Sequence, residues 1–379
     1  MKISVLKERR PYEARVAVTP ETAKKFISAG HEVAVESGAG LNAAFPDALY
    51  EAIGATIAKD MKSALKGADV VLKVQAPLSK EEGEDEISHL PEGCLLVGVL
   101  SPYKNADHLK AYAEKKIKAM SLEFVPRITR AQAMDVLSSQ ANLAGYRAVI
   151  ETASTLSRAF PMMMTAAGTI APAKVLILGA GVAGLQAIAT AKRLGAVPSA
   201  FDVRAATKEQ VESLGGKFIT VESEESGEGT GGYAKEMSAD YQKRQREKIK
   251  ETMAKSDIVI TTALIPGKPA PRLIDADMVQ AMRPGSVILD LAVESGGNVE
   301  GSILGEIAVH HGVKIIGYPN LPSRIPTDAS AMFAKNILNF MGLMMPQDSK
   351  DITIPWDDEI IQATALTKDG AIIHPQFKA

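Results

Sequence analysis

A glycine-rich segment, followed at a fixed distance by an acidic residue, is the clearest chemical feature of this sequence. Residues 179–184 read GAGVAG and follow the apolar run Val175 to Leu178. A helical pattern comes next, and then a second apolar segment that ends at Asp202, eighteen positions beyond Gly184. This order predicts a strand, a tight turn, a helix and a second strand, which is the arrangement that binds dinucleotides.

Each glycine of this segment has its own predicted task. Gly179 permits the turn, Gly181 lets a pyrophosphate approach the backbone, and Gly184 lets the helix pack closely on the strand. The N-terminus of the helix then faces the phosphates. Asp202 would accept hydrogen bonds from the adenosine ribose, which favours NAD over NADP because a 2′-phosphate would be repelled. Arg204 is a mild signal in the opposite direction.

A second set of polar residues lies at the start of a predicted helix over residues 128–160. Gln132, Asp135 and Ser138 follow one another at intervals of three, so one helix face would present an amide, a carboxylate and a hydroxyl. Such a face can hold a nicotinamide carboxamide or a ribose, and a solvated face without a ligand remains the alternative. Further candidates, nearer the N-terminus or beside this segment, are Arg15, Lys73, Arg127 and Arg130.

Short apolar segments alternate with helical patterns along the chain, which predicts parallel sheets covered by helices. The first sheet is expected to use residues 3–6, 32–35, 70–74, 95–100 and 118–122. The second is expected to use residues 175–178, 199–202, 218–221, 258–262, 287–291 and 314–316. The fold class is therefore α/β, with two Rossmann-like domains, each a mainly parallel sheet flanked by helices.

A chain of 379 residues is too long for one comfortable core, which supports two domains. We expect residues 1–135 and 328–379 to form the first domain and residues 136–327 to form the second, NAD-binding domain. The helix over 128–160 and a helix after Pro326, capped by Thr327 or Asp328, would join them and leave a cleft between. The tail, with strand-like ITIPW and a turn at residues 369–370, would complete the first domain.

Residues 222–240 form a long segment rich in glycine and acid, with Tyr233 after two glycines. Loops of this length are functional lids or disordered insertions, and the residues alone favour neither. Residues 80–86, KEEGEDE, are expected to form an acidic exposed segment. The histidines are predicted at the surface or at strand edges; they are His31, His89, His108, His310, His311 and His374.

The overall composition excludes several classes of function. A net charge of −2 gives no general attraction to nucleic acid or to anionic lipid. The single cysteine excludes an internal disulfide, and no spacing of cysteine or histidine suggests a metal site. No segment is expected to insert into a membrane, although docking onto a membrane partner is compatible with the sequence.

Several consecutive segments carry a more specific resemblance. They are RITRAQAMDVLSSQANLAGYRAV, FPMMMTAAGT, VRAATKEQVESLGGKFITV, TTALIPGKPAP, LAVESGGN and FAKNILNF. In this order they closely resemble the NAD(H)-binding domain of the Re/Si-specific, proton-translocating NAD(P) transhydrogenase. The resemblance covers essentially the whole chain, including the terminal DGAIIHP. Alanine dehydrogenase, with the same two-domain plan, is a more distant relative.

The resemblance implies a set of NAD(H) contacts. Around the nicotinamide they would be Arg127, Gln132, Asp135 and Ser138, with Gln132 and Asp135 orienting the ring. Around the rest of the nucleotide they would be Gly179, Gly181, Val182, Gly184, Asp202, Val203 and Arg204. Residues 222–240 would be a mobile loop that closes over the nucleotide and brings Tyr233 against it.

The resemblance also implies partners. Hydride would pass between NAD(H) on this chain and NADP(H) on a separate domain, while a membrane-spanning subunit couples the transfer to proton movement. The chain would be a homodimer, and a separate bacterial subunit held peripherally at the cytoplasmic side of the inner membrane.

Two alternatives remain, an alanine dehydrogenase-like enzyme and a non-catalytic module that senses NAD. Alanine dehydrogenase needs a general acid/base, and its histidine would follow residues 95–100, where this sequence has Ser101, Pro102 and Tyr103. An aspartate of that enzyme corresponds to Glu294, whereas Arg15 and Lys73 match its carboxylate-binding pair. Transfer between two nicotinamides needs no acid/base, so no catalytic residue of that kind is predicted.

Overall fold

The computed structural model describes residues 1–221, 227, 237–265, 267–346 and 351–378. The chain divides into two compact units. Unit 1 comprises Met1–Gln140 and Ser323–Ala379, and unit 2 comprises Ala141–Pro322. In the described part of the chain, no helix combines the length and the apolar character that crossing a bilayer requires.

Unit 1 is built on a six-stranded parallel sheet in the order β3-β2-β1-β4-β5-β6. Its strands are β1 (Lys2–Val5), β2 (Glu32–Glu36), β3 (Thr56–Ala58), β4 (Val70–Gln75), β5 (Leu95–Val99) and β6 (Lys118–Ser121). Most are runs of buried valine, leucine and isoleucine, as expected for a sheet covered on both faces. Five of the six strands were predicted. The sequence TIA of β3 is too short and too exposed to give a signal.

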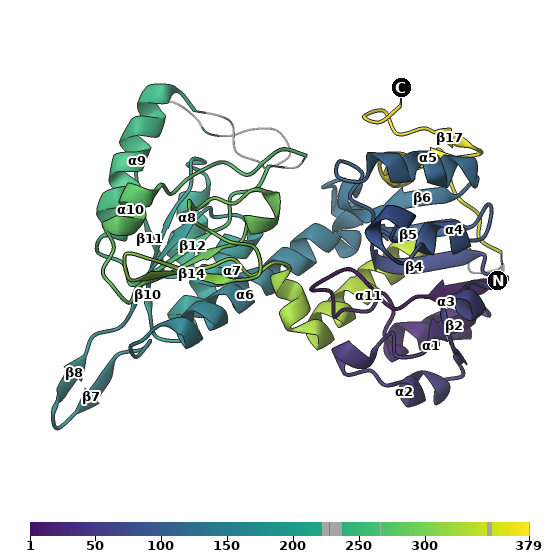
Figure 1. Ribbon diagram of the computed structural model, residues 1–379, viewed down its shortest axis with the longest axis horizontal. Coiled ribbons are helices and arrows are strands. Elements are labelled where there is room, and N and C mark those ends of the chain that lie inside the picture. The colour runs from purple at the N-terminus through teal and green to yellow at the C-terminus, as the bar shows by residue number, and fades with distance from the viewer. Residues whose placement is uncertain (222–226, 228–236, 266, 347–350, 379) are drawn as a thin grey trace. The chain divides into compact units, whose positions relative to one another are not determined.

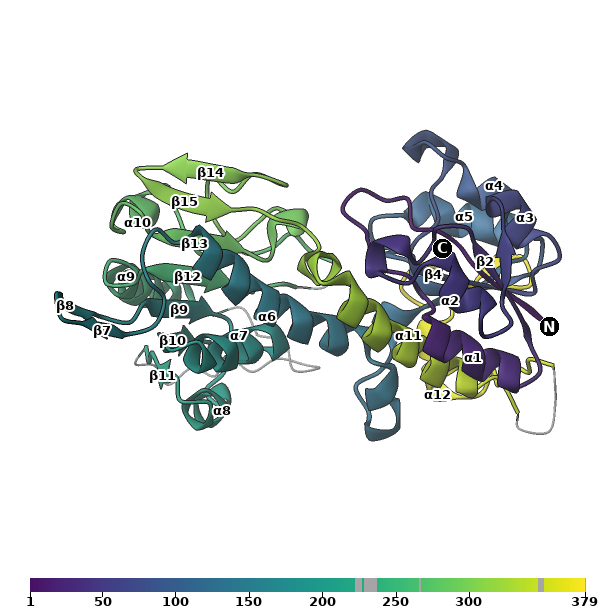
Figure 2. The ribbon, with the colours of Figure 1, turned by 90° about the horizontal axis from the view of Figure 1, so that it is seen from below.

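Helices cover both faces of this sheet (Figure 2). One face packs against α1 (Pro20–Ser28), α2 (Asp47–Glu51), α11 (Pro326–Gly342) and α12 (Glu359–Thr364). The other packs against α3 (Met61–Leu65), α4 (Glu86–His89) and α5 (Ala106–Glu114). The second core also holds Cys94, the only cysteine of the chain, whose residue exposure is 3%. Burial raises the pKa of its thiol to about 12.

The C-terminal portion of unit 1 differs from the sequence prediction in two details. Residues 352–356 form no strand; a short antiparallel pair, β16 (Thr367–Lys368) and β17 (Ala371–Ile372), flanks the predicted turn instead. Helix α11 begins where expected, but its N-cap is Ile325 and no side chain caps it. Thr327 donates its hydroxyl to the carbonyl of Ala43, 3.0 Å away, so tertiary contact has replaced the cap.

Unit 2 contains a sheet in the order β11-β10-β9-β12-β13-β15-β14, parallel except for the edge strand β14. Its strands are β9 (Lys174–Leu178), β10 (Val197–Phe201), β11 (Lys217–Phe218), β12 (Ile258–Thr261), β13 (Val287–Asp290), β14 (Ile307–His310) and β15 (Val313–Ile316). Five of the six predicted strands are confirmed, and the sixth, predicted at residues 218–221, is present only as the two-residue β11. The edge strand β14 was missed because only Ala308 of its four residues is buried.

Among its described residues, unit 2 wholly contains the four α-helices α7 (Val182–Arg193), α8 (Thr207–Ser213), α9 (Ala239–Met253) and α10 (Ala276–Gln280). Most of α6 (Val136–Thr155) packs here too, through Ala148 and Val149. A separate hairpin of β7 (Met163–Thr165) and β8 (Gly168–Ile170) projects away from the sheet (Figure 1). Described 3-10 helices are η1 (Leu41–Ala43), η2 (Lys80–Glu82), η3 (Leu122–Phe124), η4 (Thr129–Met134), η6 (Val293–Ser295) and η7 (Leu321–Arg324).

Candidate nucleotide-binding site

The glycine turn follows β9, the strand at which the order of the unit 2 sheet reverses. Ligands of open α/β sheets bind at this kind of switch point, beyond the carboxyl ends of the strands. Gly179 has φ of +104°, a conformation that favours glycine. A Cβ atom on Gly179 would lie 2.4 Å from Oγ1 of Thr262, whose hydroxyl donates to the Gly179 carbonyl over 3.1 Å. Thr262 therefore fixes the turn from the neighbouring strand, a role that sequence reasoning missed.

The other two glycines meet opposite surroundings. A Cβ atom on Gly184 would lie 1.8 Å from the carbonyl oxygen of Gly179, so only glycine allows α7 to pack on the turn. Gly181 is the N-cap of α7, and no described heavy atom lies within 4 Å of its Cβ position. The first amides of α7 have no partners within the helix. Open space beside a helix N-terminus fits a pyrophosphate, as the spacing predicted.

Asp202 lies directly beyond β10, next to the glycine turn. The backbone amide of Ala180 donates to its Oδ2 over 2.7 Å, so the carboxylate is tied to the turn itself. Arg204 donates to the same carboxylate from its backbone amide, Nε and Nη2, at 2.9, 2.9 and 2.7 Å. Asp202 is 8% exposed. Its carboxylate accepts hydrogen bonds from four donors, one on Ala180 and three on Arg204.

A further close approach involves α6 and the start of α7. A Cβ atom on Gly145 would lie 2.1 Å from the carbonyl oxygen of Ala183. Gly145 thus lets α6 press against the first turn of the helix whose amides face the predicted phosphate position. No periodic signal marks this glycine in the sequence, because it lies inside an ordinary helical pattern.

The candidate nicotinamide contacts do not lie on one continuous helix, so that element of the prediction was wrong. Gln132 lies in η4, Asp135 ends it with φ −72° and ψ 92°, and Ser138 lies in the first turn of α6. The Asp135 carboxylate accepts the Ser138 amide at 2.8 Å and its hydroxyl at 2.6 Å. Aspartate competes with helical hydrogen bonds in this way, and it begins a new helix here instead of continuing the old one.

Arg127 and Gln132 are both exposed. Arg130, also exposed, forms ion pairs with Asp358 at 2.8 Å and Glu359 at 3.2 Å, so it belongs to the surface of unit 1. These residues and Asp135 belong to unit 1, whereas the glycine turn and Asp202 are brought together in unit 2.

Tyr233 and most of the 222–240 segment lie outside the described residues. Gly227, which is described and buried, lies against the residue between Asp202 and Arg204. A Cβ atom on it would be 2.3 Å from the carbonyl oxygen of Val203. At this residue the segment therefore touches the turn that carries Asp202.

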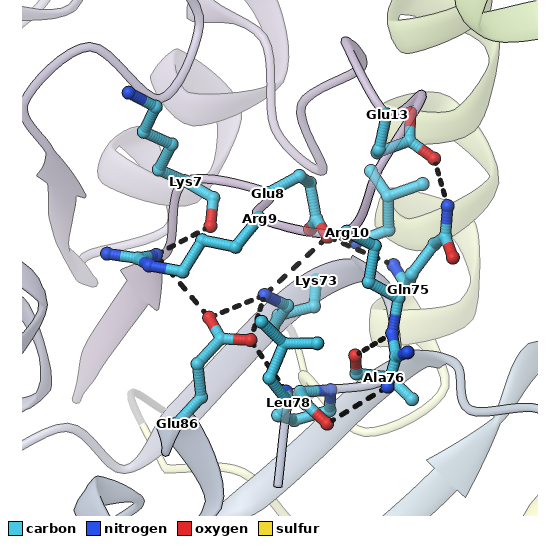
Figure 3. Close-up of polar contacts among 12 residues, drawn as sticks. Lys7, Glu8, Arg9, Arg10, Glu13, Lys73, Gln75, Ala76, Leu78 and Glu86 are labelled. Atoms are coloured by element: carbon cyan, nitrogen blue, oxygen red, sulfur yellow. Dashed lines mark hydrogen bonds and ion pairs between the residues drawn. The ribbon is translucent and has the colours of Figure 1, made fainter. Parts of the chain in front are cut away.

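The switch point of unit 1, between β1 and β4, is filled by charged side chains (Figure 3). Lys73 is 1% exposed, and its Nζ lies 2.8 Å from Oε1 of Glu86 and 3.5 Å from Oε2 of Glu8. Glu8 also accepts the amide of Val74 at 2.7 Å. Burial, only partly opposed by Lys73, raises the pKa of Glu8 to about 7. The predicted exposure of residues 80–86 was wrong for Glu86, which is fully buried because it neutralises Lys73.

Arg15 is neutralised in a similar way. Glu13 accepts from its Nε at 2.8 Å and from its Nη2 at 2.7 Å, and Gln140 accepts from its Nη1 at 2.8 Å. Gln75 donates its amide to Glu13 at 2.6 Å. Burial alone would raise the pKa of Glu13, but the charge and hydrogen bonds of Arg15 outweigh it and lower the pKa to about 2. Arg15 and Lys73 therefore both have carboxylates of the chain itself as partners.

Comparison with known proteins gives the relationship of the whole chain. Models of the alanine dehydrogenase/PNT N-terminal and C-terminal domains match residues 4–144 and 148–375. An NAD(P) transhydrogenase alpha-subunit polypeptide of Rhodospirillum rubrum is 57% identical over 377 residues, covering 99% of this chain and 98% of the relative. This chain belongs to the NAD(P) transhydrogenase alpha-subunit family.

A solved structure and a more distant sequence relative support this family assignment. The crystal structure of transhydrogenase from Sinorhizobium meliloti matches 98% of this chain and 100% of its own, with a TM-score of 0.89 and 48% identity. Alanine dehydrogenase of Bacillus subtilis is more distant, at 30% identity over 357 residues, 89% of this chain and 86% of the relative. The predicted resemblance and the Rossmann-like α/β fold are confirmed.

Of the six histidines, His310 and His311 are exposed, as the sequence suggested, whereas three others are buried. His31, His108 and His374 are 4%, 7% and 6% exposed, so a surface position was wrong for these three. His108 contacts Glu82 at 3.1 Å, and burial lowers its pKa. Glu294 accepts the backbone amide of Asn320 at 3.0 Å.

Proposed function

We propose that this chain binds NAD(H) at the glycine turn of unit 2 and presents it for hydride exchange with NADP(H) held on a separate component. The observation that carries the proposal is the open face of Gly181 at the N-terminus of α7, beside the carboxylate of Asp202. Membership of the transhydrogenase alpha-subunit family supports the same reaction. Bound NAD(H) would supply the hydride chemistry.

In this proposal the protein binds and orients. Gly179 and Gly184 hold the turn, while the amides at Gly181 and Val182 face the pyrophosphate. Asp202, Val203 and Arg204 border the adenosine ribose. The residues that would orient the nicotinamide are Arg127, Gln132, Asp135 and Ser138. For Asp135 and Ser138 this role would be added to helix capping, because each already bonds the other.

The 222–240 segment would close over the nucleotide and bring Tyr233 to it, excluding water from the reacting rings. Its contact at Gly227 with Val203 supports a position beside the ribose. No acid/base side chain is assigned, since exchange between nicotinamides needs orientation only.

The partners proposed are an NADP(H)-binding domain and a membrane-spanning subunit that couples transfer to proton movement, with this chain peripheral at the cytoplasmic side of the membrane. A homodimer is also proposed. Its support is the β7–β8 hairpin, in which Met163 and Met164 are 47% and 76% exposed. An isolated two-stranded hairpin is marginally stable in water, so a second copy would stabilise it.

The test is to incubate the chain with NADH and an oxidised NADP analogue, with and without the NADP-binding component. Hydride transfer that requires the mixture is expected, with Re/Si stereochemistry read from deuterium-labelled nucleotide. Oxidation of NADH by pyruvate and ammonia with the chain alone would support the alanine dehydrogenase alternative and reject this proposal. Binding of NADH without hydride transfer in the mixture would support the other alternative, a non-catalytic module that senses NAD.

A further inference from the structure

The carboxylate of Asp202 has no spare acceptor position in this structure. A carboxylate offers about four lone-pair sites, and here Ala180 and Arg204 supply four donors. The Arg204 side chain contributes two of these, in the paired geometry that guanidinium groups form with carboxylates and phosphates. A ribose hydroxyl that binds Asp202 must therefore displace a donor of Arg204 or share an oxygen with it.

We propose that Asp202 selects NAD(H) mainly by holding Arg204, so that Arg204 is a latent binding group for the 2′-phosphate of NADP(H). This inference rests on the proposed NAD(H) site and adds a specificity-determining residue to it. Repulsion by the Asp202 charge alone is a weak account of the choice, because the adjacent guanidinium neutralises that charge at 2.7 Å.

The positions of the two side chains support the proposal. Arg204 lies only two residues beyond Asp202, on the same turn. The Arg204 side chain is 19% exposed and that of Asp202 is 5% exposed, so the cation is the member of the pair that an incoming phosphate reaches more easily. Arginine binds phosphate in two-pronged fashion, and an arginine near the ribose accommodates the 2′-phosphate in NADP-binding relatives of this fold.

The experiment measures equilibrium binding of NADH and NADPH to the full chain by titration of nucleotide fluorescence. Asp202→Asn keeps an acceptor for the Ala180 amide but removes the carboxylate charge that pairs with Arg204. This variant is expected to bind NADPH at least about tenfold more tightly than the parent, the scale of one charge-assisted hydrogen bond. NADH should bind more weakly to it.

Two double variants identify the responsible group. Asp202→Asn with Arg204→Gln should lose the gain in NADPH affinity. Asp202→Asn with Lys208→Gln should keep it, because Lys208 is an exposed cation on the following helix. Equal NADPH affinity with and without Arg204 would overturn the proposal, as would an Asp202→Asn protein that binds NADH but gains no NADPH affinity.

If circular dichroism shows that the Asp202→Asn protein does not fold, the single variant Arg204→Gln tests the proposal instead. This single variant should lower the ratio of NADPH to NADH affinity about fivefold or more. An unchanged ratio would overturn the proposal. A parent chain that binds no NADH would instead reject the proposed function, so the two failures are distinct.

Discussion

The sheets of the two units share their order over five strands, including the switch point, but they use this switch point in opposite ways. In unit 2, β9 is the first strand of the sheet along the chain, and it leads into a glycine turn with open space at Gly181. In unit 1 the corresponding strand leads into a charged segment, and Glu8 joins Lys73 and Glu86 in a buried cluster. The strand order therefore creates the position for a ligand, and the residues that follow the first strand decide whether it is open.

Breaking the unit 1 cluster should have the largest effect. Lys73→Met leaves Glu8 and Glu86 buried without the ammonium that lies 2.8 Å from Glu86. Removal of one partner from a buried ion pair costs about 3 to 5 kcal/mol of unfolding free energy. Denaturant titration would measure the loss, with Lys59→Met as a control because that side chain is 84% exposed. NADH affinity of the folded protein should hardly change; a large change would show that the two switch points are not independent.

A matched pair of alanine substitutions separates packing from openness in unit 2. Gly184→Ala should destabilise the protein by about 3 kcal/mol, because its methyl group meets the Gly179 carbonyl. Gly181→Ala, at φ −77°, should change stability by less than about 1 kcal/mol. It should nevertheless weaken NADH binding about tenfold or more, since the methyl group fills the phosphate position. Normal NADH affinity in the Gly181→Ala protein would contradict the open-site interpretation.

Asp202→Ala should weaken NADH binding by about 1 to 3 kcal/mol, the value of a hydrogen bond to a charged group. The Ala180 amide loses its acceptor in the same variant. Calorimetric titration would measure the affinity, and thermal unfolding would report any loss of the turn. Unchanged affinity would remove Asp202 from the site.

Effects no larger than this one depend on pH and belong to unit 1. The raised pKa of Glu8 means that the unfolded chain releases this proton first, so its contribution to stability falls as pH rises from about 4.5 to about 7. Glu8→Gln should therefore gain about 1 to 3 kcal/mol of unfolding free energy relative to the parent between about pH 5 and pH 8.

Glu13 has the opposite sign: its contribution to stability is present above about pH 4.5 and is lost as pH falls towards about 2. The difference in unfolding free energy between the parent and Glu13→Gln should show that reversed dependence when both are denatured at a series of pH values. A difference that does not change with pH would refute the assignment for the residue concerned, Glu8 or Glu13.

The sequence predicted the strands well because buried strands are continuous apolar runs with turn residues around them. It also located the glycine turn and Asp202, whose spacing is set by one crossover. It could not predict that Glu86 is buried, because the residue lies in an acidic stretch and its partner Lys73 comes from a strand thirteen positions earlier. Charge pairing across strands leaves no periodic trace in the chain.

Two further misses come from individual contacts. Spacing by three between Gln132, Asp135 and Ser138 suits a helix face, but the Asp135 carboxylate binds the backbone of Ser138 and starts a new helix. Gly145 looks like any helical glycine until the approach of Ala183 from another helix is known. Both depend on contacts that a one-dimensional pattern does not contain.

The lone cysteine gives this chain a built-in chemical probe of one half. Cys94 is buried in the core of unit 1, and a thiol with a pKa of about 12 has almost no thiolate at neutral pH. Alkylating reagents will therefore modify Cys94 only when unit 1 opens, so the rate of alkylation measures how often that unit opens. Cysteines introduced on the surface of unit 2 can carry a dye or spin label while Cys94 remains in place.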